Sequence, residues 1–308
     1  MEEIKFVVQE SDAGLRLDKC IAVNHPAVSR SYVQKLIESG GAWINGNTGR
    51  CKDFVKVGDE VKVLIPAPEG LEVEAEDIPL KIIYEDDDLI VVDKPKGLVV
   101  HPAAGHFTGT LVNGLLYHCN GSLSGINGIL RPGIVHRIDK DTTGIIVACK
   151  NDAAHRGLAE QFKEHSITRR YDALVYGVFK EPEGRIESLI SRNPEERMKM
   201  MVNPVRGKYA VTNYRVVEQF GTKYSHIVCQ LETGRTHQIR VHMSSLGHPL
   251  LGDTIYGPKK DPFQLTGQTL HAGVLGFTHP TTGEYMEFSS DLPQYFYELI
   301  QKFRNQFG

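Results

Sequence analysis

The 308-residue chain has few cysteines and no long apolar segment. Its five cysteines are scattered, odd in number and never spaced as C-x-x-C, which argues against a disulfide framework and against a structural zinc site. No stretch approaches the roughly 18 apolar residues that a membrane-spanning helix needs. The first residues, MEEIKFVVQE, carry acids where a secretory signal has a basic start and an apolar run. We therefore expect a soluble, cytoplasmic protein.

The chain also lacks a strong excess of either charge, since its net charge is −3. That average hides a division along the sequence. Residues 1–66 carry 9 basic and 9 acidic side chains, residues 67–88 carry one lysine and 9 acids, and residues 89–308 carry 25 basic and 20 acidic side chains. The largest part is therefore mildly basic. This permits RNA binding without demonstrating it, because the positions of the charges matter more than their sum.

The length allows two domains and a large core. Residues 67–80 are rich in acids and have a proline near each end, which is typical of an extended, self-repelling linker. We therefore place the domain boundary in this linker. It separates a small domain, residues 12–66, from a large domain, residues 81–305.

The sequence of the small domain predicts two short helices followed by strands. Leu17 and Ile21 lie on one face of the first helix, and Ser29 is a suitable N-cap for the second, which spans about 30–39. Strands are then expected around an Asn-Gly turn at 45–46.

This arrangement resembles the S4 RNA-binding module, in which paired helices and a hairpin grip structured RNA. The resemblance implies that Arg16, Arg30 and Lys35 contact the phosphate backbone. On charge alone, a solvated helix face with scattered cations explains the same residues equally well.

The segment that organises the large domain is Gly133-Ile-Val-His-Arg-Ile-Asp-Lys-Asp-Thr-Thr-Gly144. The apolar run that follows it predicts a buried strand, and the polar segment before that strand predicts a loop. Loops seated on rigid strands commonly hold catalytic groups. Asp139 lies between Arg137 and Lys140, and these cations favour the ionised carboxylate, a possible nucleophile or base. The alternative is that the acids and threonines of this loop only cap a turn.

The segment resembles the HRLD-x-x-[ST]-[ST]-G signature of the RluA-type pseudouridine synthases, with Ile138 in place of the usual leucine. Two further segments are similar to motifs of the same family and stand in the family's order. They are Lys94-Pro95-x-Gly97 with His101-Pro102, and Thr233-Gly-Arg-Thr-His-Gln-Ile-Arg240. The resemblance covers roughly residues 12–305. It is closest to the synthase D branch, which modifies a stem-loop of large-subunit (23S) ribosomal RNA.

The resemblance also implies the roles of individual residues. Asp139 is the catalytic aspartate, and Arg235 pairs with it. Arg137 fills the space left by a flipped nucleotide, and Tyr171, in a strand predicted over 168–177, lies over the target base. From the residues alone, a tyrosine in a strand is more often a packing residue.

The converted uridine undergoes no net redox change or hydrolysis, so the resemblance implies neither a cofactor nor a metal. His237, Gln238 and His242 invite a metal interpretation, but their spacing is not H-E-x-x-H and no carboxylate follows at a ligand position. The expected partner is RNA, either large-subunit ribosomal RNA or a pre-ribosomal particle. No membrane is expected to take part, and we expect a monomer.

The fold class predicted from these elements is α+β, with a mixed, mainly antiparallel sheet flanked by helices around a central cleft. Residues 190–215 carry six cations against two acids. They are either an RNA-facing edge or a solvated hairpin.

Three alternatives to this function stay open. The same chemistry could act on other ribosomal or transfer RNA uridines. The chain could be a non-enzymatic ribosome-assembly factor, or a hydrolase that uses Asp139 with His136.

Overall fold

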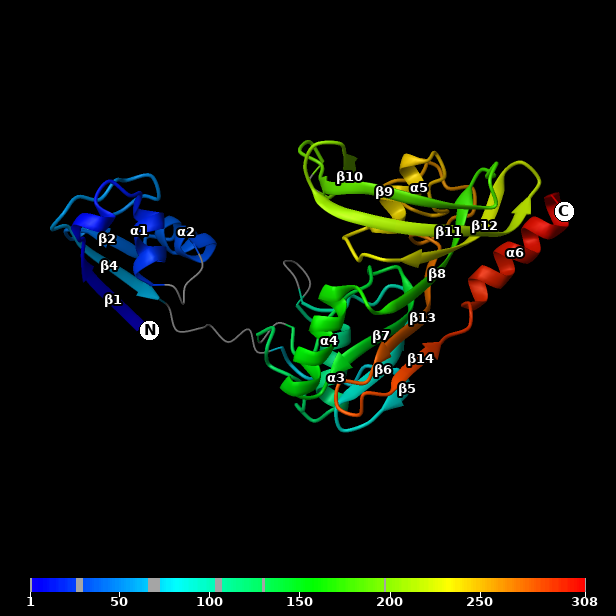
Figure 1. Ribbon diagram of the computed structural model, residues 1–308, viewed down its shortest axis with the longest axis horizontal. Helices are drawn as coiled ribbons and strands as arrows, with labels where there is room; N and C mark the ends of the chain where they lie inside the picture. The colour runs from blue at the N-terminus through cyan, green and yellow to red at the C-terminus, as the bar shows by residue number, and fades with distance from the viewer. Residues whose placement is uncertain are drawn as a thin grey trace. The chain divides into compact units, whose positions relative to one another are not determined.

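The computed structural model describes residues 2–25, 30–65, 73–102, 107–128, 131–196 and 198–307 (Figure 1). The chain divides into two compact units, Met1–Leu71 and Glu72–Gly308. No helix in the described ranges is both long and apolar enough to cross a membrane.

The small unit is a four-stranded antiparallel sheet with two helices. Its elements are β1 (Glu2–Val7), α1 (Leu17–Asn24), α2 (Arg30–Glu38), β2 (Ala42–Ile44), β3 (Asn47–Thr48) and β4 (Glu60–Ile65). The strand order is β1-β4-β2-β3. Both predicted helices are present, while Ser29, the expected N-cap of α2, lies outside the described residues.

The core of the small unit lies between the helices and the sheet. Leu17 and Ile21 of α1 are buried with Val33 of α2 and with Val61 and Val63 of β4. The helical spacing of the first three and the alternation of the last two bring these side chains to one interior. The Asn-Gly turn is also present. Both of its residues have positive φ, 50° and 79°, which asparagine and glycine tolerate best.

The large unit is built on a ten-stranded sheet with the order β10-β9-β11-β12-β8-β13-β7-β6-β5, and β14 pairs with β13. Its strands are β5 (Lys81–Glu85), β6 (Leu89–Lys94), β7 (Thr143–Cys149), β8 (Thr168–Tyr176), β9 (Glu183–Arg192), β10 (Met200–Asn203), β11 (Lys208–Phe220), β12 (Tyr224–Leu231), β13 (Leu270–Thr278) and β14 (Tyr285–Ser289). Among the described pairings, β7 runs parallel to β13 and the others are antiparallel. The α+β class and the mixed sheet are therefore confirmed.

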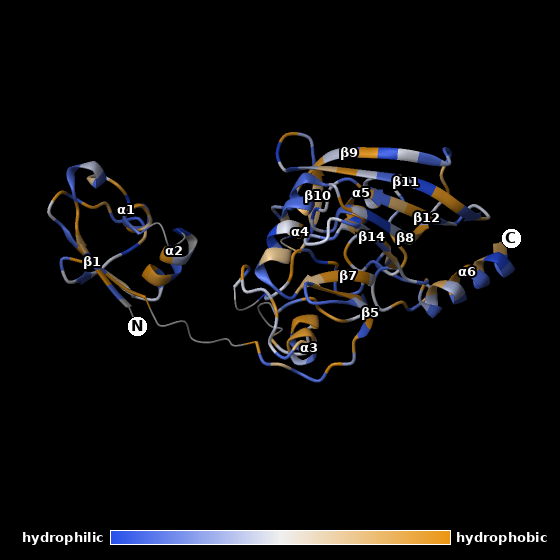
Figure 2. Ribbon diagram, turned by 60° about the horizontal axis from the view of Figure 1, so that its bottom comes forward, coloured by the Kyte–Doolittle hydropathy of each residue, from blue (hydrophilic) through white to orange (hydrophobic). Residues whose placement is uncertain are grey.

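Helices cover this sheet at several places. They are α3 (Leu111–His118), α4 (Asp152–Glu164), α5 (Gln238–Ser245) and α6 (Gln294–Phe307). Helix α4 packs on β7, α5 on β10 and β11, and α6 on β11 (Figure 1). Every residue of β7 is buried, and the strand is hydrophobic in Figure 2. It therefore forms the rigid centre beside the signature loop.

The apolar run Leu98-Val-Val100, after the Pro95-x-Gly97 turn, predicts a short strand, but this strand does not form. Val99 makes only an isolated bridge with Thr110. The carbonyls of Val99 and Val100 instead accept the N–H groups of the first two residues of α3, over 2.8 and 3.1 Å. The beginning of a helix has free N–H donors, and here they take the acceptors that a neighbouring strand would have used.

Candidate active site

The signature loop, residues 133–142, runs directly into β7. The register of β7 against β13 depends on Gly144, which has a φ of 108° and at which a Cβ would collide with the backbone of Ala272. Within the loop, the N–H of Thr142 donates to the carbonyl of Asp139 over 3.1 Å. The loop therefore presents Asp139 from a short turn on a fixed strand.

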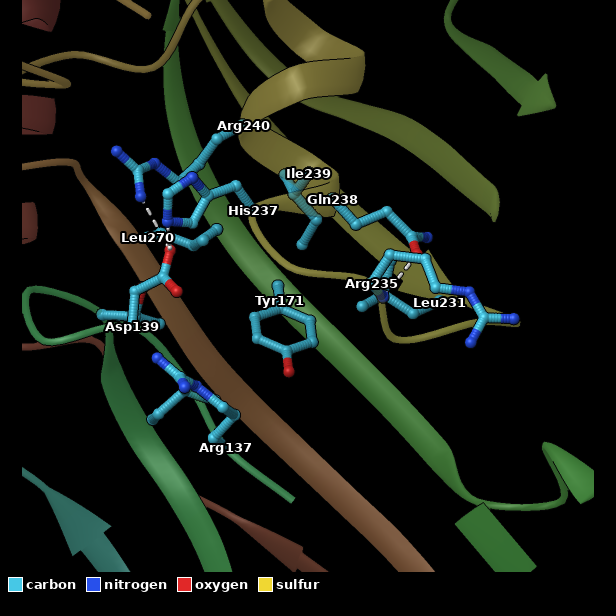
Figure 3. Close-up of a pocket in the computed structure, with 12 residues that line it drawn as sticks. Arg137, Asp139, Tyr171, Leu231, Arg235, His237, Gln238, Ile239, Arg240 and Leu270 are labelled. Carbon is cyan, nitrogen blue, oxygen red and sulfur yellow. Dashed lines mark hydrogen bonds and ion pairs between the residues drawn. The ribbon is translucent and has the colours of Figure 1, made fainter. Parts of the chain in front are cut away.

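Asp139 lines a small pocket of about 60 Å³. The three other catalytic-domain residues predicted from the sequence, Arg137, Tyr171 and Arg235, line the same pocket (Figure 3). They come from the signature loop, from β8 and from the turn before α5. The structure therefore brings the four residues together around one cavity.

The carboxylate of Asp139 is paired with Arg240 and not with Arg235. Nη1 of Arg240 donates to Oδ2 of Asp139 over 2.8 Å. Nε of Arg235 donates instead to the backbone carbonyl of Tyr209 over 2.8 Å, and its guanidinium points away from Asp139 in Figure 3. The predicted Asp139–Arg235 pair is therefore wrong. Arg235 lies in the turn, whereas Arg240 lies within α5, from which it reaches the signature loop.

A second carboxylate holds Arg240 in place. Nε and Nη2 of Arg240 donate to the two oxygens of Asp253 over 2.7 and 2.9 Å, and the guanidinium lies 5.1 Å from the ring centre of Tyr256. Burial alone would lower the pKa of Arg240, but hydrogen bonds and charges from Asp253 and then Asp139 raise it above its ordinary value. Arg240 is therefore a cation that joins two carboxylates through charge-assisted bonds.

His237 approaches the same carboxylate from the residue before α5. Its backbone is left-handed, with a φ of 55°. Its Nδ1 lies 2.9 Å from Oη of Tyr256, and its Nε2 lies 3.8 Å from Oδ2 of Asp139. Burial lowers the pKa of His237, although the charge of Asp139 opposes this effect. The neutral imidazole is therefore favoured beside the Asp139–Arg240 pair.

Tyr171 supplies the aromatic wall of the pocket. Its side chain is 8% exposed, and the ring lies with Leu231, Ile239 and Leu270 around the cavity. Burial raises the pKa of the phenol, so the hydroxyl is protonated at neutral pH. The pocket therefore combines a carboxylate with a flat apolar surface.

Comparison with known proteins identifies the family of this chain. Residues 88–245 match the family described as RNA pseudouridylate synthase. The chain is also 49% identical over 304 residues to the uncharacterized RNA pseudouridine synthase YlyB of Bacillus subtilis (strain 168), with 99% of both chains covered. The chain belongs to the RNA pseudouridine synthase family. It is an isomerase that acts on RNA.

Two further comparisons agree with this family. The synthase is 47% identical over 304 residues to the ribosomal large subunit pseudouridine synthase D of Zymomonas mobilis, with 94% of each chain covered. Among solved structures it is similar to human RNA pseudouridylate synthase domain containing 1. That match has a TM-score of 0.56 and 28% identity, and it covers 77% of this chain and 97% of the human chain.

The side chains considered as metal ligands have protein partners in this synthase. Oε1 of Gln238 accepts the hydroxyl of Thr233 over 2.8 Å, and the two ring nitrogens of His242 each lie 2.9 Å from a hydroxyl, those of Thr212 and Ser188. His237 contacts Tyr256, as described above. These contacts fasten α5 and the turn before it to the sheet, which accounts for the polar residues of the third motif.

Arg137 and His136, which precede Asp139 in the signature, lie in different surroundings. Arg137 is exposed, and its guanidinium has no hydrogen-bond or ion-pair partner among the described residues. Nε2 of His136 accepts the N–H of Val147 over 3.1 Å, and its ring stacks on Phe162 at 4.6 Å. Burial, with a smaller contribution from Arg169, lowers the pKa of His136 to about 3. His136 is therefore occupied within the protein, which removes the support for a hydrolase that uses it as a base.

Two of the three predicted RNA-binding cations of the small unit share one carboxylate. Arg16 and Arg30 both pair with Asp18, over 3.1 and 2.9 Å, and Gln34 donates to the same carboxylate over 2.6 Å. The Asp18 side chain is fully buried, while the two arginines stay 38% and 49% exposed. Lys35 is exposed, with no partner in the described part of the unit. The two arginines therefore outnumber the single acid that they share.

Sequence reasoning missed Arg240, Asp253 and Tyr256. A usable signal was present, because Arg240 stands among the buried residues of α5. A cation at such a position needs a buried counter-charge. Asp253 follows shortly after α5 in the sequence, and Tyr256 comes three residues later.

Proposed function

We propose that this synthase isomerises specific uridines of large-subunit ribosomal RNA. The observation that carries the catalytic part is the Asp139 carboxylate, which Arg240 holds in the pocket that the Tyr171 ring also lines. The choice of RNA is supported by relatives named ribosomal large subunit pseudouridine synthase D, which are similar over nearly the whole chain. Such an enzyme works in the cytoplasm, on free RNA or on a pre-ribosomal particle, and as a monomer.

The isomerisation breaks the N1–C1′ bond of the target uridine and forms a C5–C1′ bond after the uracil has turned. The proton on C5 leaves, and N1 gains one, so atoms and electrons balance without an oxidant or a water. Asp139 starts this sequence either by attack on the nucleotide or by proton abstraction. Oδ2 of Asp139 is occupied by Arg240, and Oδ1 has no hydrogen-bond donor among the described residues. Oδ1 is therefore the oxygen that meets the substrate.

The target base must leave the RNA stack to reach this carboxylate, at a cost of about a few kcal/mol. Arg137 is exposed at the pocket and lacks a partner in the described structure, so its guanidinium is free to enter the vacated stack. Tyr171 offers the flipped uracil a ring to stack on, which offsets part of the cost. Its protonated hydroxyl is also a possible proton donor at the end of the reaction.

The small unit acts as an S4-type RNA-binding domain in this proposal. The domain includes the predicted span 12–66 and also β1, which pairs with β4. The catalytic domain includes residues 81–305, and residues 73–80 of the predicted linker, 67–80, pack on it, since Nδ2 of Asn113 donates to the carbonyl of Glu74 over 2.8 Å. Arg16 and Arg30 share Asp18, which fixes the direction of both guanidinium groups without cancelling their combined charge. With Lys35 they supply contacts to RNA phosphates.

Pseudouridine mapping in a strain that lacks this gene tests the choice of RNA. We expect specific pseudouridines to disappear from the large-subunit ribosomal RNA and to return when the gene is restored. Restoration with the Asp139→Asn gene should leave them absent, which separates the enzyme from a non-enzymatic assembly factor. Loss confined to transfer RNA, or to the small subunit, would overturn the assignment.

A further inference from the structure

A second cavity, of about 330 Å³, adjoins the catalytic pocket. It shares Arg137, Asp139, Tyr171 and Arg235 with that pocket. Its other lining residues include Arg169 and His165. Asp139 is the only acid that lines it among the described residues, and this carboxylate is already paired with Arg240. The cavity therefore has an uncompensated positive charge.

Arg169 is the most enclosed of these cations. It lies on β8, is 6% exposed, and its Nε is buried without a hydrogen-bond partner. Nη2 donates to the backbone carbonyl of Glu232 over 3.2 Å, and the guanidinium lies 5.8 Å from the ring centre of Phe162. No carboxylate in the described structure pairs with it. A buried guanidinium without a counter-charge is costly, so an anion that enters this cavity gains a ready partner.

Gly234 makes the space for this guanidinium. A Cβ at position 234 would collide with Nη1 of Arg169. The glycine of the Thr-Gly-Arg turn therefore allows Arg169 to reach the cavity wall, while the next residue of the same turn, Arg235, brings a second guanidinium to it.

Arg235 is held in a position that leaves its charged end available. Its Nε donates to the carbonyl of Tyr209, and its backbone N–H donates to Oε1 of Gln238. Its two terminal nitrogens have no acceptor among the described residues. His165, at the end of α4, faces the same cations. Burial, then Arg235 and Arg169, lower the pKa of His165, which is consistent with their close approach.

We propose that Arg169 and Arg235, with His165 beside them, form a phosphate site for the substrate RNA. The site binds the phosphodiester group next to the flipped uridine, and the proposal rests on the function proposed above. Two guanidinium groups match the geometry and charge of a phosphate. Arg137, Asp139 and Tyr171 line both cavities, so a phosphate bound here belongs to the nucleotide at the catalytic pocket or to its neighbour.

The first test compares Arg235→Gln with the wild-type enzyme on an unmodified large-subunit RNA stem-loop that contains a mapped target uridine. We expect KM for this RNA to rise about tenfold, with kcat changed less than about twofold, because a phosphate contact binds substrate and transition state alike. Arg235→Lys should restore part of the loss. The control is Arg304→Gln, which removes an exposed arginine of α6 that lines neither cavity, and it should leave KM unchanged.

The second test removes the charge from the RNA. A neutral methylphosphonate replaces each of the two phosphates that flank the target uridine in turn. At one of these linkages, the neutral RNA should raise KM of the wild-type enzyme by the same factor as Arg235→Gln raises KM for the unmodified RNA. On that neutral RNA, KM of the variant should rise no further. Two results overturn the phosphate site. One is that the rises in KM from the variant and from the neutral linkage multiply at both linkages, and the other is that Arg235→Gln has the wild-type KM. Absence of pseudouridine with the wild-type enzyme contradicts the proposed function instead, so the two failures are distinguishable.

Discussion

Asp253 acts on Asp139 through Arg240, and this makes it a positioning residue. Asp253→Asn removes one charge from a buried carboxylate–guanidinium–carboxylate arrangement. We expect stability to fall by about 3 kcal/mol, because a buried ion pair loses one partner. We also expect kcat to fall by about tenfold or more, since Arg240 can then turn away from Asp139.

Urea unfolding and single-turnover conversion of RNA measure these two effects of the Asp253→Asn substitution separately. Asp253→Glu, which keeps the charge, should recover part of the rate and thereby separate positioning from folding. If Asp253→Asn converts RNA at the wild-type rate, Arg240 does not need its second carboxylate.

Tyr171 combines two properties that substitution can separate. Tyr171→Phe keeps the ring and removes the hydroxyl, so we expect RNA affinity near that of the wild type and a slower reaction. Tyr171→Leu removes the ring as well and should weaken binding of the flipped base by about 1–3 kcal/mol, the usual contribution of base stacking. Affinity and single-turnover rate are measured for both variants. A Tyr171→Leu enzyme with unchanged affinity contradicts the stacking role.

The family resemblance placed Asp139 and Tyr171 in one site, as the structure does, but it paired Asp139 with Arg235 instead of Arg240. The third motif contains both Arg235 and Arg240, and spacing along the chain does not tell which of them faces Asp139. The direction follows from the turn into α5, where His237, the residue before the helix, is left-handed. His237 also contacts Tyr256, 19 residues further on, which no local pattern contains.

Lys94 ties two elements of the large unit together. It ends β6 and is fully buried, and its Nζ donates to the carbonyls of Pro95, Leu98 and Lys140, each over 2.9 Å. The first two belong to the Pro-x-Gly turn, and the third follows Asp139 in the signature loop. The family's first motif therefore has a structural task, which is to hold the loop that carries Asp139.

Lys94 also gives a prediction about pH. Burial lowers the pKa of Lys94 to about 7, against the opposing charges of Asp141 and Asp139. In the unfolded chain the ammonium regains its ordinary pKa of 10.5, so between these values the unfolded state binds more protons than the folded state. The contribution of Lys94 to stability therefore rises with pH across this window. The free energy of unfolding of the wild type, minus that of Lys94→Met, should increase from about pH 7 to about pH 10. A difference that stays flat or falls would refute the lowered pKa.

The elements with strong local signals were predicted well. Helix α2 spans Arg30–Glu38, close to the expected 30–39, and α1 contains Leu17 and Ile21 as expected, because caps and apolar periodicity are local. Strand β1 was not predicted, since its pairing with β4 joins residues about 60 positions apart and leaves no local trace. The missing strand near Val99 has a similar cause, because α3 takes its acceptors.

For the whole molecule, the two units divide the work of binding and catalysis in our proposal. Lys35→Gln should weaken binding of the large-subunit RNA and leave the rate on bound RNA unchanged. If Lys35 neutralises one phosphate, the slope of log affinity against log salt should become shallower by about one unit. Filter binding over a salt series measures this slope. An unchanged slope removes Lys35 from the RNA-binding surface.

The division of the chain was visible in its composition, because an acidic, proline-flanked segment differs from both neighbours. The order of the sheet was not, since β8 lies between β12 and β13 and β7 joins β13 in parallel. Such pairings depend on packing across the whole unit. These pairings determine the position of the site beside β7. The sequence alone predicted residues that form the site, but not where the site lies in the sheet.

The central claim, that the Asp139 carboxylate carries out the isomerisation, is tested most directly by tritium release from RNA labelled at C5 of uridine. The account predicts that Asp139→Asn releases no tritium above background while it binds the same RNA with nearly wild-type affinity, because the amide keeps the shape and loses the charge. Release at the wild-type rate by Asp139→Asn would contradict the account.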